Sequence, residues 1–216
     1  MRRDDAAAGG SGPAGWTAGS EEGAVTTQLQ PVRLSAGRMA LLVQQAGGFE
    51  HVKRRQDLYT NDGAKLERLW SAAEGAGPAW STVAVVPADG GQRDDIIHLQ
   101  GLRPGGAGAD TLSASRLTWD AERRTLASQP LPELPALVAG TYASVKAAKQ
   151  AASKEACLAD YWVLPAERLG GEPSRWVLAA VAADTAGIRS EAARPCGSTI
   201  RRRAAAYRPT GARPKE

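Results

Sequence analysis

Residues 81–102 read STVAVVPADGGQRDDIIHLQGL, and this stretch decides the fold class. Residues 81–87 are β-branched or apolar, which is typical of a strand. Residues 88–91 supply turn-forming Asp and Gly, and residues 95–102 have the composition of a partner strand. The stretch therefore predicts a β-hairpin, the unit from which antiparallel sheets are built.

Two more hairpins are predicted further along the chain. Residues 112–119 and 125–128 flank a polar turn, and a last hairpin spans residues 160–183 around the turn Gly170-Gly171-Glu172-Pro173. Between these hairpins, the Ala-rich and Lys-containing residues 142–158 have the propensity of a helix.

The chain before residue 75 shows helical spacing instead. Apolar residues recur at i, i+3, i+4 and i+7 from Met39 to Ala46, before the glycines at 47 and 48. Residues 49–59 and 66–73 predict two more short helices by the same criterion. Short helices followed by hairpins predict an α+β fold with an antiparallel sheet and one Ala-rich helix.

The composition predicts three parts. Residues 1–30 are rich in Gly, Ala, Ser, Thr and Glu, and we expect them to be disordered because they hold too little apolar surface to offset the entropy of ordering. Residues 31–197 form one predicted α+β domain, and residues 198–216 a basic C-terminal tail. Eight basic residues against two acidic ones give residues 189–216 a net charge of +6, so the rest of the chain carries −2.

The same composition excludes several classes of protein. The longest apolar run, residues 176–183, is far shorter than a membrane span, so no membrane partner is expected. Arg2 and Arg3 are followed by aspartates rather than an apolar stretch, which argues against a secretory signal. Cys157 and Cys196 are then expected to be reduced thiols, which predicts a cytoplasmic location.

Motifs that bind cofactors or metals are absent from the sequence. No phosphate-binding loop, HExxH, paired CxxC or GxSxG occurs, and no cofactor is expected. Zinc could use Cys157, Cys196, His51 and His98, but these residues form none of the local pairs typical of structural sites, so no metal is expected.

His98 is the one candidate for acid–base chemistry. It follows Asp94 and Asp95, and a carboxylate can orient an imidazole for proton transfer. The sequence offers no nucleophile beside them, so a solvated strand histidine is the favoured interpretation and an enzyme that uses His98 with Asp94 or Asp95 is the weaker alternative.

Basic clusters give the stronger functional signal. Guanidinium groups bind phosphate oxygens in bidentate fashion, and an aromatic ring can stack on a base. The candidate residues for such contacts are Arg201, Arg202, Arg203, Tyr207 and Arg208, with a second cluster at Lys53, Arg54 and Arg55. The sequence thus predicts a non-enzymatic nucleic-acid-associated accessory or regulatory protein. The alternative is a protein-binding regulator or structural subunit that uses the Trp-bearing hairpin 160–183 as its contact surface.

Overall fold

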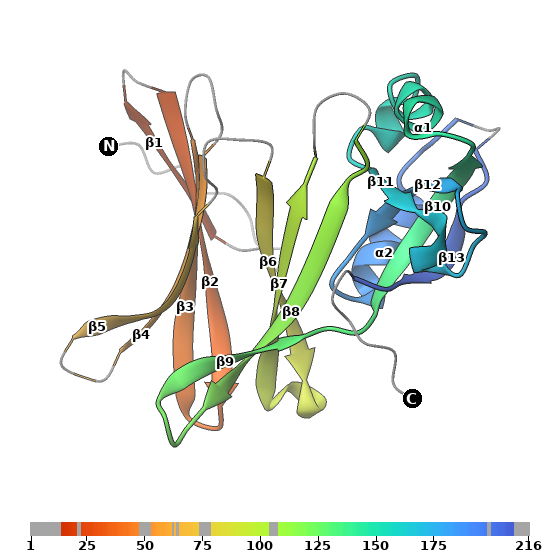
Figure 1. Cartoon of the computed structure of the whole chain (residues 1–216). Helices are drawn as coiled ribbons and strands as arrows, with labels where there is room; N and C mark the ends of the chain where they lie inside the picture. Colours follow the sequence, from red (N-terminus) through yellow and green to blue (C-terminus); the bar gives the residue numbers. More distant parts are fainter. Residues whose placement is uncertain are drawn as a thin grey trace.

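The fold is mostly β, and the α+β prediction is wrong. The computed structural model describes residues 14–20, 23–47, 53–61, 63, 65–73, 79–103, 108–197 and 200–209. In these ranges thirteen strands form three antiparallel sheets, joined by two α-helices and three short 3-10 helices (Figure 1). None of the helices in these ranges is long and apolar enough to cross a bilayer.

The first sheet pairs five strands in chain order. These strands are β1 (Ala14–Ser20), β2 (Gly23–Ser35), β3 (Arg38–Gly47), β4 (Lys53–Asn61) and β5 (Leu66–Ala73). The three helices predicted before residue 75 are therefore β3, β4 and β5. Of the segment expected to be disordered, residues 14–20 and 23–30 are in strands, whereas residues 1–13 lie outside the described ranges.

The residues that face inward explain why the sequence pattern did not indicate the strands of this sheet. In β2 and β3 the buried residues alternate with period two, as Val32 and Leu34 do, but β4 presents Gln56, Leu58 and Thr60 to the interior. Two of these three side chains are polar, so the apolar alternation that marks a strand is lost.

The middle sheet confirms the predicted hairpins. It pairs β6 (Ala79–Ala88), β7 (Arg93–Leu102), β8 (Thr111–Asp120) and β9 (Thr125–Pro130) in chain order, and the turn after β6 contains the 3-10 helix η1 (Asp89–Gly91).

The third sheet has the order β11-β12-β10-β13. Its strands are β10 (Leu134–Tyr142), β11 (Trp162–Pro165), β12 (Trp176–Val181) and β13 (Arg203–Tyr207). The strands β11 and β12 confirm the hairpin predicted at 160–183, although the 3-10 helix η3 (Ala166–Leu169) lies in their connection.

Two α-helices contact the third sheet. Helix α1 (Val145–Ala152) confirms part of the helix predicted at 142–158, and α2 (Thr185–Ala193) has no counterpart in the sequence analysis. The 3-10 helix η2 (Ala156–Leu158) follows α1, and its Cys157 is bonded to Cys196. The expectation of two reduced thiols is therefore wrong, and both sulfurs are lost as zinc ligands. The described residues hold no cluster that could bind a metal.

Part of the predicted basic tail belongs to the folded body. Strand β13 pairs with β10, and the side chain of Tyr207 is 1% exposed. Its hydroxyl donates a hydrogen bond of 2.9 Å to the backbone oxygen of Leu112, in the middle sheet. This residue therefore anchors the C-terminal strand in the core.

The three sheets are stacked, with the middle sheet buried on both faces. Ile96 of β7 packs in a cluster with Val32 and Leu42 of the first sheet, whereas Ile97 and Leu99 pack with residues of the third sheet. Successive side chains of a strand point to opposite faces, so one strand contributes to two cores.

Trp162 is the centre of the contact between the middle and third sheets. Its indole is 3% exposed and lies edge-to-face with Trp80, with 5.2 Å between ring centroids. The ring also lies directly against the backbone of Gly101 in β7, where a Cβ atom would come within 2.6 Å of Trp162 Cζ3. Only glycine leaves room for this indole.

We predict that Gly101→Ala destabilises the protein by about 1–3 kcal/mol, because the added methyl group overpacks a buried contact. Urea unfolding followed by tryptophan fluorescence measures the change. The control is Gln100→Ala, an exposed neighbour on the same strand, with an expected effect within about 0.5 kcal/mol. Equal effects of the two substitutions would contradict the role given to Gly101.

Candidate functional site

His98 lies in a buried polar chain between the first and middle sheets. Its side chain is 7% exposed, so the prediction of a solvated histidine is wrong. Nε2 lies 2.8 Å from Ser81 Oγ, and the ring is edge-on to Trp70 with centroids 4.9 Å apart. Ser81 Oγ in turn donates to Gln56 Oε1 at 3.3 Å, and Gln56 Nε2 donates to the Ser81 backbone oxygen at 3.0 Å. His98 thus donates from Nε2 if every member of the chain is to be satisfied.

Neither Asp94 nor Asp95, which precede His98 in the sequence, forms a hydrogen bond with it in the structure. Asp94 accepts a hydrogen bond of 2.7 Å from the backbone N–H of Arg33, and Asp95 pairs with Arg116 at 3.2 Å. A buried histidine without a carboxylate partner has little to offer as a general base. The arrangement therefore gives no support to the enzymatic alternative.

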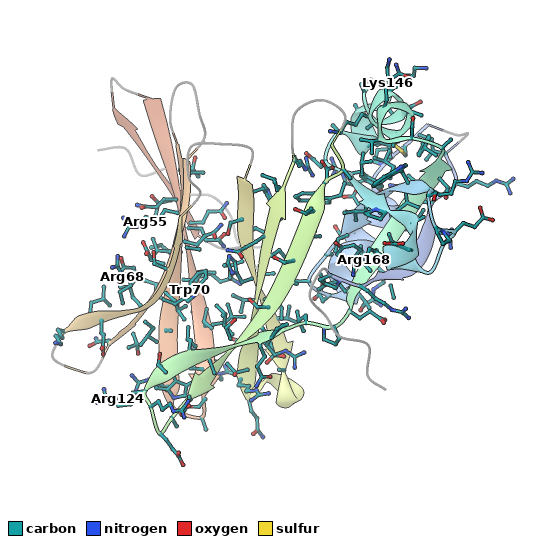
Figure 2. The ribbon with its side chains drawn as sticks, viewed as in Figure 1. Arg55, Arg68, Trp70, Arg124, Lys146 and Arg168 are labelled. Atoms are coloured by element: carbon teal, nitrogen blue, oxygen red, sulfur yellow. A yellow bond between two sulfur atoms is a disulfide. The ribbon has the colours of Figure 1, made fainter. Side chains whose placement is uncertain are left out.

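The basic residues predicted to contact phosphate are divided between the two outer sheets. The side chains of Lys53 and Arg54 lie outside the described residues. Arg55 on β4 donates to Asp57 at 2.7 Å. The C-terminal arginines belong to the third sheet and its flanks, on the other side of the stack (Figures 1 and 2).

Arg202 is bound to its own chain. Its guanidinium donates to the backbone oxygens of Glu191, Ala192 and Arg194, at 2.9, 2.8 and 2.7 Å. These carbonyls lie at the C-terminal end of α2, where a cation offsets the helix dipole and satisfies groups that lack helical partners. Arg202 therefore stabilises the fold.

Arg201, Arg203 and Arg208 are exposed. Their side chains make no ion pair within the ranges that the structure describes. Arg208 is held in place through its backbone, whose N–H donates to the oxygen of Arg168 at 2.9 Å. Three of the five residues predicted at the C-terminus are thus accessible, and they flank or belong to β13.

The Trp-bearing hairpin 160–183 does not present an open aromatic surface. Trp162 is buried between two sheets and Trp176 is half-buried. The protein-binding alternative, which relies on this hairpin, gains no contact surface from its tryptophans.

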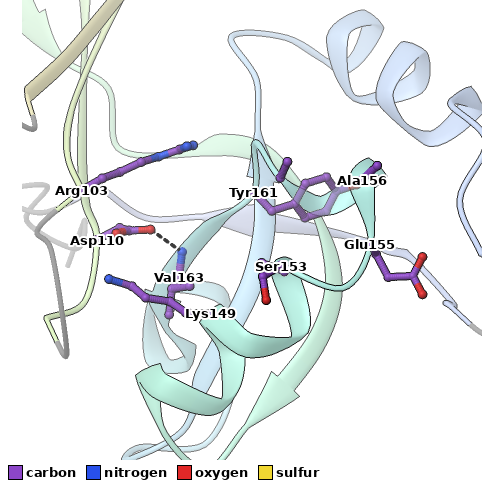
Figure 3. Close-up of a pocket in the computed structure, with 10 residues that line it drawn as sticks. Arg103, Asp110, Lys149, Ser153, Glu155, Ala156, Tyr161 and Val163 are labelled. Atoms are coloured by element: carbon purple, nitrogen blue, oxygen red, sulfur yellow. Dashed lines mark hydrogen bonds between the residues drawn. The ribbon is translucent and has the colours of Figure 1, made fainter. Parts of the chain in front are cut away.

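Two cavities that sequence analysis missed flank Arg103 at the end of β7. One has a volume of about 390 Å³ and the other about 350 Å³, and Arg103 and Tyr161 line both. We call the two together the Arg103 cleft. In the larger cavity, Arg103 and Asp110 lie beside Lys149 and Ser153 from α1 and its end (Figure 3). The smaller cavity adds the tryptophans Trp80 and Trp162.

Arg103 is fixed in position, and it forms no ion pair with a carboxylate of the described residues. Its guanidinium carbon lies 4.1 Å from the centre of the Trp162 ring, and Nη2 donates to the backbone oxygen of Asp160 at 2.6 Å. Nε is buried without a hydrogen-bond partner. Burial lowers the pKa of Arg103, and the more distant charges of Asp110 and Asp160 offset this only in part.

Four acidic residues that the structure describes line the cleft, and Arg103 forms an ion pair with none of them. Asp110 accepts a hydrogen bond of 2.8 Å from the Val163 N–H, and Glu191 pairs with Arg194 at 3.0 Å. Burial raises the pKa of Asp110, while that hydrogen bond and the charge of Lys149 act in the opposite direction. Asp160 lies 4.0 Å from Arg194, and Glu155 also lines the larger cavity. Among the described residues, the guanidinium of Arg103 is thus left without an ion pair although carboxyl groups lie nearby.

Tyr161 contributes a second buried polar group. The residue is 4% exposed, and its hydroxyl lies near Arg202 and Glu191 but makes no hydrogen bond of normal geometry with either. Burial raises the pKa of this hydroxyl, so it is a donor at neutral pH.

No family model matches this chain, and neither a curated protein nor a solved structure is similar to it. The functional assignment therefore rests on the geometry of its sites.

The buried His98 predicts a pH-dependent stability. Burial lowers its pKa below the ordinary value of 6.5, so the unfolded chain binds a proton more readily than the folded one. The free energy of unfolding should therefore be highest above about pH 7 and fall as the pH drops through about 6.5 towards the lower folded pKa. Urea unfolding at several pH values measures this slope.

His98→Gln should remove that part of the slope, whatever its effect on stability at neutral pH. His51→Gln, at the other histidine of the chain, is the matched control and should retain it. A slope unchanged in the His98 variant would show that other groups produce it.

Proposed function

We propose that this chain is a non-enzymatic binding protein and that its ligand is a small organic carboxylate held in the Arg103 cleft. The observation that carries the proposal is the half-buried Arg103 guanidinium, which is stacked on Trp162 and has no ion pair with any acidic residue that the structure describes. Removing a cation from water costs free energy unless an opposite charge compensates, and a bound carboxylate supplies that charge.

The geometry favours a carboxylate over other anions. A planar guanidinium binds a carboxylate through two parallel hydrogen bonds, and stacking on Trp162 fixes the plane in which they form. Trp80 and Trp162 add an apolar wall for the carbon skeleton of the ligand. The volumes of about 350 and 390 Å³ lie within the range of small-molecule sites, roughly 300–1,000 Å³.

We predict that the wild-type protein shows a saturable change in tryptophan fluorescence with one or more members of a carboxylate panel. The panel comprises acetate, succinate, citrate and N-acetylated amino acids at constant ionic strength. Arg103→Gln should weaken binding by about 10- to 100-fold, because it removes charge-assisted hydrogen bonds worth roughly 1.5–3 kcal/mol. Arg103→Lys should recover only part of the affinity, since an ammonium group lacks the bidentate geometry.

The control is Arg175→Gln, because Arg175 is partly exposed and pairs with Glu172 outside the cleft. Circular dichroism establishes that each variant is folded. Absence of saturable binding across the panel, or equal affinity of wild type and Arg103→Gln, would overturn the proposal.

Nucleic-acid binding is the second candidate function. It is favoured by the exposure of Arg201, Arg203 and Arg208 around β13, on a segment of high positive charge. Three accessible guanidinium groups can neutralise phosphates and release counterions. Arg202 and Tyr207 do not strengthen this proposal, since their side chains bind within the fold.

For this second function we predict that anisotropy titrations with a labelled oligonucleotide show an affinity that falls with salt. The triple variant Arg201→Gln/Arg203→Gln/Arg208→Gln should reduce the slope of log K against log salt by about 3, one unit per phosphate contact. The control changes the exposed Arg123, Arg124 and Arg175 to Gln. An affinity that is independent of salt, or a slope that the triple variant leaves unchanged, would exclude this function.

The disulfide bears on where the protein works. Bonded cysteines are typical of oxidising compartments. The bond between Cys157 and Cys196 therefore favours maturation in such a compartment over the cytoplasmic location predicted from the sequence.

A further inference from the structure

Three glutamines form a row across the first sheet. In the register of the sheet, Gln28 on β2 lies opposite Gln44 on β3, and Gln44 lies opposite Gln56 on β4. The row is graded in depth: Gln56 is buried, Gln44 is half-buried and Gln28 is exposed. It therefore runs from the interior of the protein to its surface.

This row marks the place where the core between the first and middle sheets stops being apolar. The neighbouring row towards the core is Gln30, Leu42 and Leu58, and the buried Val32, Ala40 and Thr60 form the row beyond. Inward positions of stacked sheets are ordinarily apolar. Three carboxamides in one inward row are therefore a departure from the packing of the same strands one row away.

A cavity of about 250 Å³ opens at the row. Its lining among the described residues is Thr26, Gln28, Gln44, Gln45, Ala46, Gln56 and Thr82, none of which is charged. The strands of the two sheets lie close together at the end that carries η1 and diverge towards the other end (Figure 1). Gln56 bonds to Ser81 near the start of β6, at the end of that strand away from η1. The contact between Arg33 and Asp94 holds the closed end together.

We propose that this glutamine cleft binds a neutral carbohydrate, with the row of Gln28, Gln44 and Gln56 as its hydrogen-bonding wall. Each carboxamide offers a donor and an acceptor, and each sugar hydroxyl is both donor and acceptor, so the two surfaces are complementary without charge. The Thr26 and Thr82 hydroxyls extend the same chemistry.

The lining favours a sugar over the other small ligands. A charged ligand would find no counter-charge among the described lining residues to compensate for the loss of its hydration. An extended peptide needs pockets for alternate side chains, whereas Ala46 is the one apolar residue in the lining. A volume of about 250 Å³ fits a ligand of monosaccharide size.

Gln56 is already oriented for this role. Its Nε2 and Oε1 are bonded to the backbone oxygen and hydroxyl of Ser81, and this leaves one N–H and one lone pair for a ligand. Ser81 is hydrogen-bonded in turn to His98. The buried contacts with Ser81 and His98 therefore fix the position of Gln56 at the deep end of the cleft.

The test is saturation-transfer NMR and calorimetry with a panel of neutral sugars, namely glucose, galactose, mannose, N-acetylglucosamine and their disaccharides. We expect a saturable signal from at least one of them, with a dissociation constant no weaker than about 10 mM. The double variant Gln28→Ala/Gln44→Ala should weaken binding at least tenfold, as expected for the loss of two or more neutral hydrogen bonds.

The matched control is Gln129→Ala/Gln150→Ala, which removes two exposed carboxamides from β9 and α1. Affinity for the sugar should not change with salt, because the ligand carries no charge to be screened. Arg103→Gln should also leave it unchanged, so failure of this inference and failure of the proposed carboxylate site are distinguishable. The inference is overturned if no sugar binds, if the double variant binds as tightly as wild type, or if affinity falls steeply with salt.

Discussion

The contact between the indole of Trp162 and the backbone of Gly101 is the constraint on which the architecture depends. It sets the distance between the middle and third sheets, because a large ring from one sheet lies directly on a strand of the other. The same strand, β7, faces the first sheet through Ile96. A strand that is buried on both faces must be apolar at consecutive positions, and this is why Ile96 and Ile97 stand side by side in the sequence.

That requirement also explains which part of the fold could be predicted from the sequence. Residues 81–102 are dense in apolar residues because both of their faces are covered, so the β6–β7 hairpin was predicted correctly. Strand β4 shows the opposite case, since Gln56 and Thr60 occupy inward positions and remove the period-two signal. In β3, Met39, Leu42, Val43 and Ala46 match helical spacing by coincidence. Ala40 and Leu42 face the core, whereas Met39 and Val43 lie on the other face of the strand.

The candidate sites could be predicted less well than the fold, because they are made by contacts between sheets. Arg103 follows Gly101 by two residues, so the packing that admits Trp162 also places the guanidinium over the same ring. Nothing in the sequence near Arg103 indicates Trp162 or Asp160, which lie almost sixty residues away. The charge pattern in the sequence led to a wrong prediction for Arg202. It grouped Arg202 with accessible phosphate-binding arginines, whereas the Arg202 side chain donates to three backbone oxygens at the end of α2.

Both proposed clefts lie where two sheets meet and the apolar contact between them ends. In the Arg103 cleft the boundary is a half-buried cation, and in the glutamine cleft it is a row of carboxamides. Apolar side chains at these boundary positions would bury more apolar surface, which stabilises a fold by roughly 25 cal/mol per Å². The polar side chains found there therefore lower the stability of the stacked sheets. The two boundaries differ in chemistry, one charged and one neutral, although the same middle sheet forms part of each. Under the two proposals, this difference corresponds to two ligands, one charged and one neutral.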